Sequence, residues 1–267
     1  MYIRLFSYIQ NEQLLLRDWL DHHGAIVPWW AIHIVDNNST DDTTNILQEY
    51  KEEKGINVYI HDDYKLKGSY LTQLMIRYKA QESILIPIDG DEFIVLHKDN
   101  KIISTGNIIK DYINTLPLDG SMFKTTGCLN GLPESDHTDN PLKYITKFNW
   151  GLRGKNSKKF YYSKSFKSTD HGNHNGISTN KTYKPTDIAY LHYHNTGRVN
   201  FEKRCEADIT GLGIRLDIIK QQIAERGQEA VKSMGNYTGH AKVNAYLNKN
   251  NWEYKPVSKF DIKFQLK

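Results

Sequence analysis

The first ninety residues alternate between short apolar runs and segments whose apolar side chains recur at helical spacing. The apolar runs predict buried strands at 2–9, 30–35, 56–60 and 84–88. The segments between them predict helices at 11–23, 39–54 and 69–79. Repeated strand-helix units of this length indicate an α/β fold with a mainly parallel sheet and helices on both of its faces.

The pattern becomes less regular after residue 91. It predicts strands at 93–96, 121–126, 144–150, 160–163 and 189–193, and helices at 106–116, 199–209 and 215–225. No internal repeat or low-complexity linker separates the two parts. We therefore predict one domain over residues 1–235, divided into a regular half at 1–96 and an irregular half at 97–235, with a basic C-terminal tail at 236–267.

The composition is that of a globular protein, with 39% hydrophobic and 25% charged residues in 267. The longest mostly apolar stretch, 25–35, is broken by Pro28 and His33 and is shorter than the roughly 18 residues of a membrane-spanning helix. The first residues do not show the pattern of a secretory signal, and Cys128 and Cys205 cannot form a disulfide framework. These features predict a cytoplasmic protein.

Positive charge is concentrated in two places, although the net charge of +4 is too small to indicate a nucleic-acid-binding protein. Residues 142–167 contain eight Lys and Arg residues and no acidic residue, interleaved with aromatics. This basic stretch is either a surface that attracts anions or a solvated face whose aromatic side chains pack inward. The second excess lies in the tail, which could rest on the anionic inner surface of a membrane or be simply solvated.

The fourth predicted strand runs directly into the segment 89–93, Asp-Gly-Asp-Glu-Phe. Asp89 and Asp91 would lie at the carboxyl end of a buried strand, where ligands of parallel sheets bind. Their oxygens suit Mg²⁺ or Mn²⁺, and Gly90 would let the backbone approach a ligand closely. The alternative is an ordinary polar turn that ends a strand.

Several motifs together resemble one enzyme family. They are Asn-Glu at 11–12, Asp-Asn-Asn-Ser-Thr-Asp-Asp at 36–42, Ile-Pro-Ile-Asp-Gly-Asp-Glu-Phe at 86–93, and His-Tyr at 192–193 followed by Phe201 and Lys203-Arg204. In this order they resemble the nucleotide-sugar glycosyltransferases of the GT-A fold, and are most similar to the family 2-like and family 92-like group. The likeness covers about residues 1–210. Two places differ from the group, since Gln10 stands where the group has a Lys and residues 127–140 fit only loosely.

The resemblance implies a Rossmann-like GT-A fold whose residues 1–96 bind a nucleotide and whose residues 97–235 bind an acceptor. It implies transfer of a sugar from a nucleotide-diphosphate donor, most commonly a UDP-sugar, to a hydroxyl of a glycan or lipid-linked glycan. A bacterial enzyme of surface polysaccharide or lipopolysaccharide synthesis fits this description. We expect no nucleic-acid partner, and the basic tail is the candidate for peripheral contact with the inner membrane.

Residue roles follow from the same resemblance. The implied ligands of Mn²⁺ or Mg²⁺ are Asp91, Asp89 directly or through water, and a late histidine, His192 first and His174 next. The implied contacts to the base, ribose or diphosphate are Asn11, Asp36, Asp62, Asp89 and Lys203. Capping and turn formation are the alternative roles for Asp36 and Asp62.

An inverting reaction needs a group that takes the proton of the acceptor hydroxyl. Asp170, next to His171, is the preferred candidate, and Glu134 and Asp136 are close behind it. A retaining reaction would need no such base.

Two other functions remain open at this point. The basic stretch would suit a non-catalytic module that binds carbohydrate or nucleic acid. The late histidines His171, His174, His192 and His194 would suit a zinc hydrolase, although no HExxH pattern accompanies them.

Overall fold

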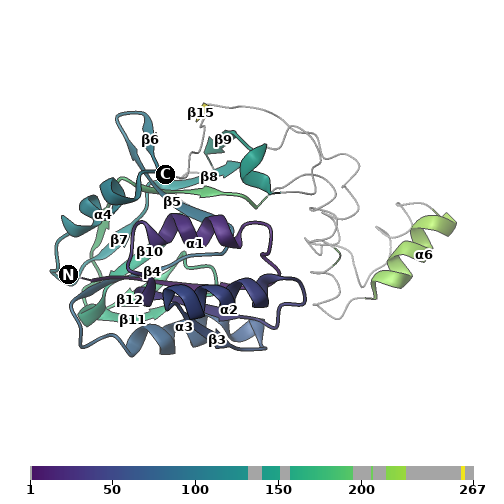
Figure 1. The fold of residues 1–267 in the computed structure, drawn as a ribbon, viewed down its shortest axis with the longest axis horizontal. Helices are drawn as coiled ribbons and strands as arrows, with labels where there is room; N and C mark the ends of the chain where they lie inside the picture. The colour runs from purple at the N-terminus through teal and green to yellow at the C-terminus, as the bar shows by residue number, and fades with distance from the viewer. Residues whose placement is uncertain are drawn as a thin grey trace. The chain divides into compact units, whose positions relative to one another are not determined.

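The computed structural model describes residues 2–131, 140–150, 157–194, 206, 215–226 and 260–261 (Figure 1). The chain forms two compact units, one made of residues 1–131, 139–194 and 258–267 and the other of 132–138 and 195–257. In the second unit the described helix is α6 (Leu216–Arg226), close to the helix predicted at 215–225. The helix predicted at 199–209 lies outside the described residues except for position 206.

The first unit is built on a seven-stranded sheet of order β13-β7-β10-β4-β1-β2-β3. Its strands are β1 (Tyr2–Ile9), β2 (Ile32–Asp36), β3 (Asn57–Ile60), β4 (Ser83–Pro87), β7 (Met122–Lys124), β10 (Lys159–Tyr162) and β13 (Tyr183–Pro185). The four strands predicted in the first ninety residues are all present, and they pair in parallel, with Leu5 of β1 between Ile32 and Ile86. The strand β10 runs antiparallel to both of its neighbours, β4 and β7.

Helices cover both faces of this sheet, as the sequence predicts. They are α1 (Leu16–Gly24), α2 (Thr43–Lys54) and α3 (Lys67–Ile76). Because successive side chains of a strand point to opposite faces, Leu5 of β1 packs in one cluster with side chains of α1 and α2, whereas Phe6 packs in a second cluster with Leu71 of α3.

A second sheet, which the sequence does not predict as a separate layer, has the order β15-β9-β8-β14-β5-β6. Its strands are β5 (Glu92–Lys98), β6 (Lys101–Ile103), β8 (Gly127–Gly131), β9 (Lys147–Trp150), β14 (Ile188–His192) and β15 (Phe260–Asp261). The remaining elements are the helix α4 (Gly106–Asn114), the hairpin of β11 (Phe166–Thr169) and β12 (Gly176–Ser178), and 3-10 turns at Trp29–Ala31, Tyr64–Leu66, Pro141–Lys143 and Ser163–Ser165.

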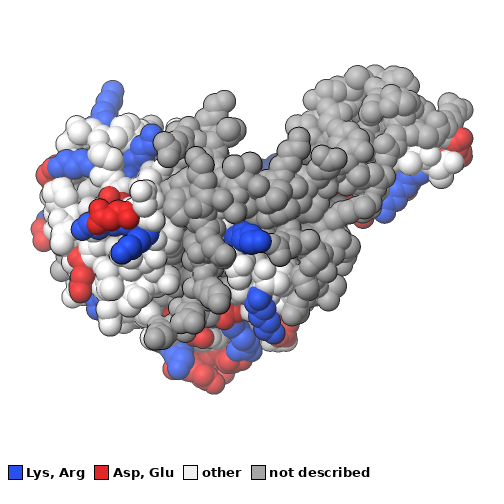
Figure 2. Space-filling model, turned by 90° about the horizontal axis from the view of Figure 1, so that it is seen from above, with Lys and Arg blue, Asp and Glu red and all other residues white. Residues whose placement is uncertain are grey.

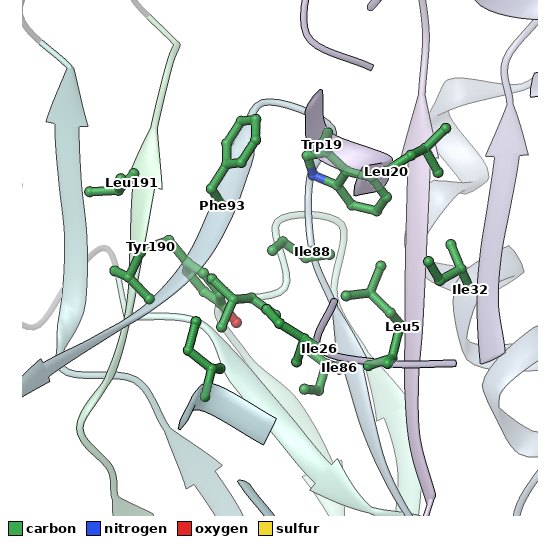
Figure 3. Close-up of a cluster of buried hydrophobic side chains, with 14 of the residues drawn as sticks. Leu5, Trp19, Leu20, Ile26, Ile32, Ile86, Ile88, Phe93, Tyr190 and Leu191 are labelled. Carbon is green, nitrogen blue, oxygen red and sulfur yellow. The ribbon is translucent and has the colours of Figure 1, made fainter. Parts of the chain in front are cut away.

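The helix α1 lies between the two sheets and joins them through its apolar side chains. Figure 3 shows Trp19 between Phe93 of the second sheet and Leu20, with Leu5 of the first sheet below them, and all four side chains are buried. Each fully buried side chain of this size contributes about 1.5–3 kcal/mol through the hydrophobic effect. The start of β5, which carries the acidic segment 89–93 into the second sheet, is therefore fixed to α1.

The helix α1 begins at Leu16 rather than at residue 11. Asn11 has a left-handed backbone (φ 56°), which no helix interior accepts, and its N–H donates to Ser39 Oγ (2.9 Å). Residues 11–15 therefore form a turn against the loop after β2. None of the described helices is both long and apolar enough to span a bilayer.

The basic stretch is not a continuous basic surface where it is described. Lys158 and Lys159 are buried, and Lys164 pairs with Glu82 at 2.7 Å. On the face seen in Figure 2, the described Lys and Arg side chains are scattered, and several of them lie beside Asp and Glu side chains. The inward-packing interpretation of the aromatics is correct for Phe160 and Phe166, which are fully buried.

Two buried imidazoles of α1 complete the hydrogen bonding of β5. The strand β6 pairs with β5 only from Leu96 onward, so no described strand covers the edge of β5 at Ile94 on that side. His22 Nε2 lies 2.7 Å from the carbonyl oxygen of Ile94, and the N–H of Ile94 donates to His23 Nε2 (3.3 Å). Burial lowers the pKa of His22 to about 4 and the pKa of His23 well below its ordinary value.

These two histidines predict that acid destabilises the fold. The unfolded chain takes up protons on them below about pH 6.5, whereas the folded chain does not, so the free energy of unfolding falls as the pH drops from 6.5 toward 4. The expected slope is about 1.4 kcal/mol per pH unit for each buried imidazole. Urea unfolding between pH 7.5 and 5 measures it. In His22→Gln the amide can still donate to the Ile94 carbonyl, but the variant has one buried imidazole fewer, so its free energy of unfolding should depend less steeply on pH. An unchanged slope in this variant would show that His22 is not the source of the acid sensitivity.

Candidate functional site

The acidic segment lies where the two sheets meet. Residues 88–91 connect the end of β4 in the first sheet to the start of β5 in the second. The backbone of this connection is held from three sides, since the N–H of Ile88 donates to Phe6 O (2.9 Å), Trp19 Nε1 donates to Asp89 O (3.1 Å) and the N–H of Tyr193 donates to Asp91 O (2.8 Å). The connection is thus a fixed platform at the carboxyl edge of the parallel strands.

Gly90 is required by packing within the protein. A Cβ at this position would lie 2.7 Å from Ile9 Cγ2 and 3.2 Å from Glu12 Cγ. The close approach seen in the structure is between Gly90 and the end of β1, and the approach of a ligand to Gly90 stays a prediction.

Two buried lysines neutralise Asp89. Lys67 Nζ donates to Asp89 Oδ1 (2.7 Å) and Lys158 Nζ to Asp89 Oδ2 (2.6 Å). Lys158 also lies 3.2 Å from Glu92 Oε1, so two ammonium groups face two carboxylates. Burial by itself would raise the pKa of Asp89, but the two lysines outweigh it and keep that pKa well below its ordinary value.

Asp91 has a different environment, because it faces two imidazoles. Its Oδ2 lies 3.4 Å from His192 Nε2 and 3.3 Å from His194 Nδ1. Donor atoms of these three residues all lie within 4.8 Å of one another, which makes them a candidate metal-binding group. Burial opposes the charge on His192, yet Asp91 raises the pKa of His192 to about 9. A carboxylate and two imidazoles form a donor set that suits a divalent transition ion.

The structure brings together part of the predicted metal site. Asp91 and His192 belong to the convergent group, and His194, which the sequence offered only for the zinc-hydrolase alternative, joins them. The spacing of 192 and 194 on one side of an extended segment was the signal for this pairing. Asp89 and His174 are outside the group, since Asp89 binds the two lysines and His174 Nδ1 lies 3.4 Å from Ser157 O.

The predicted nucleotide contacts lie at the ends of neighbouring strands. Asp36 ends β2, and its carboxylate accepts from the N–H and hydroxyl of Ser39 (3.1 and 2.5 Å) and from Thr44 (3.3 Å). Asn11 follows β1 and accepts from the N–H of Thr40 (2.8 Å). These bonds correspond to the turn-forming role considered for Asp36.

The other predicted residues fall in two classes. Asp62 follows β3 and is exposed to solvent. Lys203, Glu134 and Asp136 lie outside the described residues.

The hairpin loop that carries Asp170 is anchored to the same platform. Lys158 Nζ donates to Gly172 O (2.9 Å), and Asn173 Nδ2 lies 3.5 Å from Asp89 Oδ1. The loop backbone also packs on the first turn of α3, where a Cβ on Gly68 would lie 2.8 Å from the Asp170 carbonyl carbon. Asp170 Oδ2 accepts from Asn175 (3.1 Å), and its Oδ1 is buried without a hydrogen-bond partner in the described structure.

Comparison with known proteins gives structural likenesses only. No protein-family model matches the chain, and no curated protein matches it. A crystal structure of S. aureus TarS aligns over 88% of this chain and 44% of that one, with 15% identity and a TM-score of 0.41. TarS 1–349 in complex with UDP-GlcNAc aligns over 93% of this chain and 79% of that one, with 14% identity and a TM-score of 0.42. This chain thus spans less than half of the first TarS chain, and the fold assignment rests on the topology described above.

The buried charge cluster predicts a large difference between two lysine substitutions. Lys158→Met should leave Glu92, which is 1% exposed, and Asp89 short of a counter-charge, which should lower the free energy of unfolding by about 3–5 kcal/mol. The matched control is Lys164→Met, which breaks the exposed pair with Glu82 and should leave the free energy of unfolding almost unchanged. Urea unfolding of the three proteins measures both effects, and similar losses in the two variants would show that the cluster does not stabilise the fold.

Proposed function

We propose that this protein is a metal-dependent glycosyltransferase that moves a sugar from a nucleotide-diphosphate donor, such as a UDP-sugar, to a hydroxyl of a glycan acceptor. The observation that carries the proposal is the position of Asp91. Asp91 lies at the carboxyl edge of a parallel sheet and faces His192 and His194. The other aspartate of the same segment, Asp89, is neutralised by two lysines. Side chains of this type can bind a divalent ion next to a nucleotide.

The donor would bind across the ends of β1 to β4. Asn11, Asp36, Asp62 and Asp89 follow or end these four strands in order, which supports a nucleotide site along this edge. Asp36, whose carboxylate holds the loop after β2, would shape this site together with Asn11. Lys203 is proposed to contact the diphosphate.

Asp91 and His192 would hold Mn²⁺ or Mg²⁺. When bound, such an ion supplies Lewis-acid stabilisation of the charge that develops on the departing diphosphate. Lys67 and Lys158 keep the neighbouring carboxylate of Asp89 ionised and fixed, so that it can accept hydrogen bonds from the donor ribose.

The acceptor side is proposed from the hairpin loop. If the reaction inverts the anomeric centre, Asp170 would take the proton of the acceptor hydroxyl, with Glu134 and Asp136 as the other candidates. The anchoring of the loop to Lys158 and Asp89 supports a place for Asp170 beside the donor. We propose a role in bacterial surface polysaccharide or lipopolysaccharide synthesis, with the basic tail at 236–267 in contact with the inner membrane.

A zinc hydrolase is the second candidate function. The observation that favours it is the same group of one carboxylate and two imidazoles, which resembles the three-ligand sets of catalytic zinc sites. Release of free sugar from a UDP-sugar at the same rate with and without acceptor would favour hydrolysis. Acceptor-dependent transfer favours the glycosyltransferase.

The first test is Asp91→Asn, with the exposed Asp111→Asn on α4 as the matched control. Asp91→Asn should lower kcat/KM for transfer by at least about 100-fold, because the charge that holds the ion is lost. It should also abolish the rise in Tm that a UDP-sugar with Mn²⁺ gives to the wild type, without unfolding the apoprotein. Transfer at the wild-type rate in Asp91→Asn would refute the proposal.

A further inference from the structure

We propose that the metal site has three protein ligands, Asp91, His192 and His194, that Asn130 orients the first imidazole, and that this set selects a transition ion such as Mn²⁺ over Mg²⁺. The inference rests on the proposed function, because it specifies the ion of the same site. It adds two residues, His194 and Asn130, to which the resemblance gives no role.

The distances from Asp91 to the two imidazoles match those of a coordination sphere. Ligand atoms at about 2.1 Å from one ion lie about 3.0 Å apart at right angles and about 3.4 Å apart in a tetrahedron. Asp91 Oδ2 lies 3.4 Å from His192 Nε2 and 3.3 Å from His194 Nδ1. The carboxylate is therefore spaced from each imidazole as in a coordination sphere, and the two imidazole donors, which lie within 4.8 Å of each other, would reach one ion through side-chain rotation.

His194 has the position and exposure of a third ligand. It follows β14 by two residues, so it lies on the same side as His192, and the two ring centroids are 5.1 Å apart. The side chain of Asp91 is 10% exposed and that of His194 is 56% exposed. The group is thus closed on the Asp91 side and open on the His194 side, where a phosphate oxygen or water could complete the coordination.

Asn130 fixes the orientation of His192. The two residues are register partners in the parallel pairing of β8 and β14, and His192 Nδ1 lies 3.1 Å from Asn130 Oδ1. With the Nδ1–H donating to this amide oxygen, Nε2 is the atom turned toward Asp91. Most metal-binding histidines have such a partner for their second nitrogen, and its loss typically costs 10- to 100-fold in metal affinity.

The nitrogen donors determine the choice of ion. Mg²⁺ prefers oxygen ligands in octahedral geometry and retains its water, whereas imidazole suits divalent transition ions, Zn²⁺, Cu²⁺, Fe²⁺ and Ni²⁺ more strongly than Mn²⁺. A site with two imidazoles and one carboxylate should therefore bind Mn²⁺ in the presence of a large excess of Mg²⁺.

The experiment measures Mn²⁺ binding to the full chain without donor, from the loss of the electron paramagnetic resonance signal of free Mn²⁺. The wild type should bind one Mn²⁺, and a 100-fold excess of Mg²⁺ should displace less than half of it. His194→Ala and His194→Asn should each weaken Mn²⁺ binding by about 10- to 100-fold, and Asn130→Ala by about 10-fold. Asn130→Asp should restore binding, because a carboxylate also accepts from Nδ1–H.

The control is His171→Ala, an exposed imidazole outside the group, which should bind Mn²⁺ like the wild type. The inference is wrong if both His194 variants bind Mn²⁺ with wild-type affinity, or if Mg²⁺ competes as strongly as Mn²⁺ for the site. In either case the proposed function still stands if Asp91→Asn no longer binds Mn²⁺. Absence of Mn²⁺ binding in the wild type overturns the inference and the metal dependence together. Failure of acceptor-dependent transfer with Mn²⁺ binding intact overturns the transferase alone.

Discussion

Three carboxylates within four residues must each be neutralised where β4 of one sheet passes into β5 of the other, and this constraint shapes the surrounding structure. Asp89 and Glu92 meet Lys67 and Lys158, which are almost completely buried. Asp91 instead meets imidazoles at its accessible side. An isolated buried carboxylate would cost several kcal/mol, so the segment can exist here only with these partners.

The lysines and imidazoles that pair with the acidic segment come from segments far along the chain, so the site depends on several distant parts of the first unit. Lys67 opens α3, and Lys158 precedes β10 and also holds the carbonyl of Gly172. The same contacts hold α3 and the hairpin loop against the carboxyl edge of the sheet, with Gly68 allowing the backbones to touch. The lysines that neutralise the acidic segment thus also position α3 and the hairpin loop next to it.

The regular half of the fold could be predicted from the sequence because its strands are continuous apolar runs separated by helical patterns. The second sheet could not, since β8 contains two glycines, β6 has only three residues, and the pairing of β14 with β5 and β8 joins distant segments. Asp91 and His192 could be predicted as metal ligands because they belong to recognisable sequence motifs. Lys158 belongs to the basic stretch, and both interpretations of that stretch placed its lysines in solvent, because a charge pattern does not reveal burial. Its partner Asp89 is 69 residues away.

The two aspartates of one short motif therefore have separate electrostatic roles. The Asp89 carboxylate is part of a set of two positive and two negative charges that balance one another within the protein. The Asp91 carboxylate faces imidazoles instead, and it is the charge to which we propose that a cation binds. Because the first set is balanced in advance, a divalent ion and an anionic diphosphate could enter together without adding much net charge to the buried platform. Fixed dipoles and charges of this kind need no reorganisation during a reaction, which is the main electrostatic advantage of a preformed site.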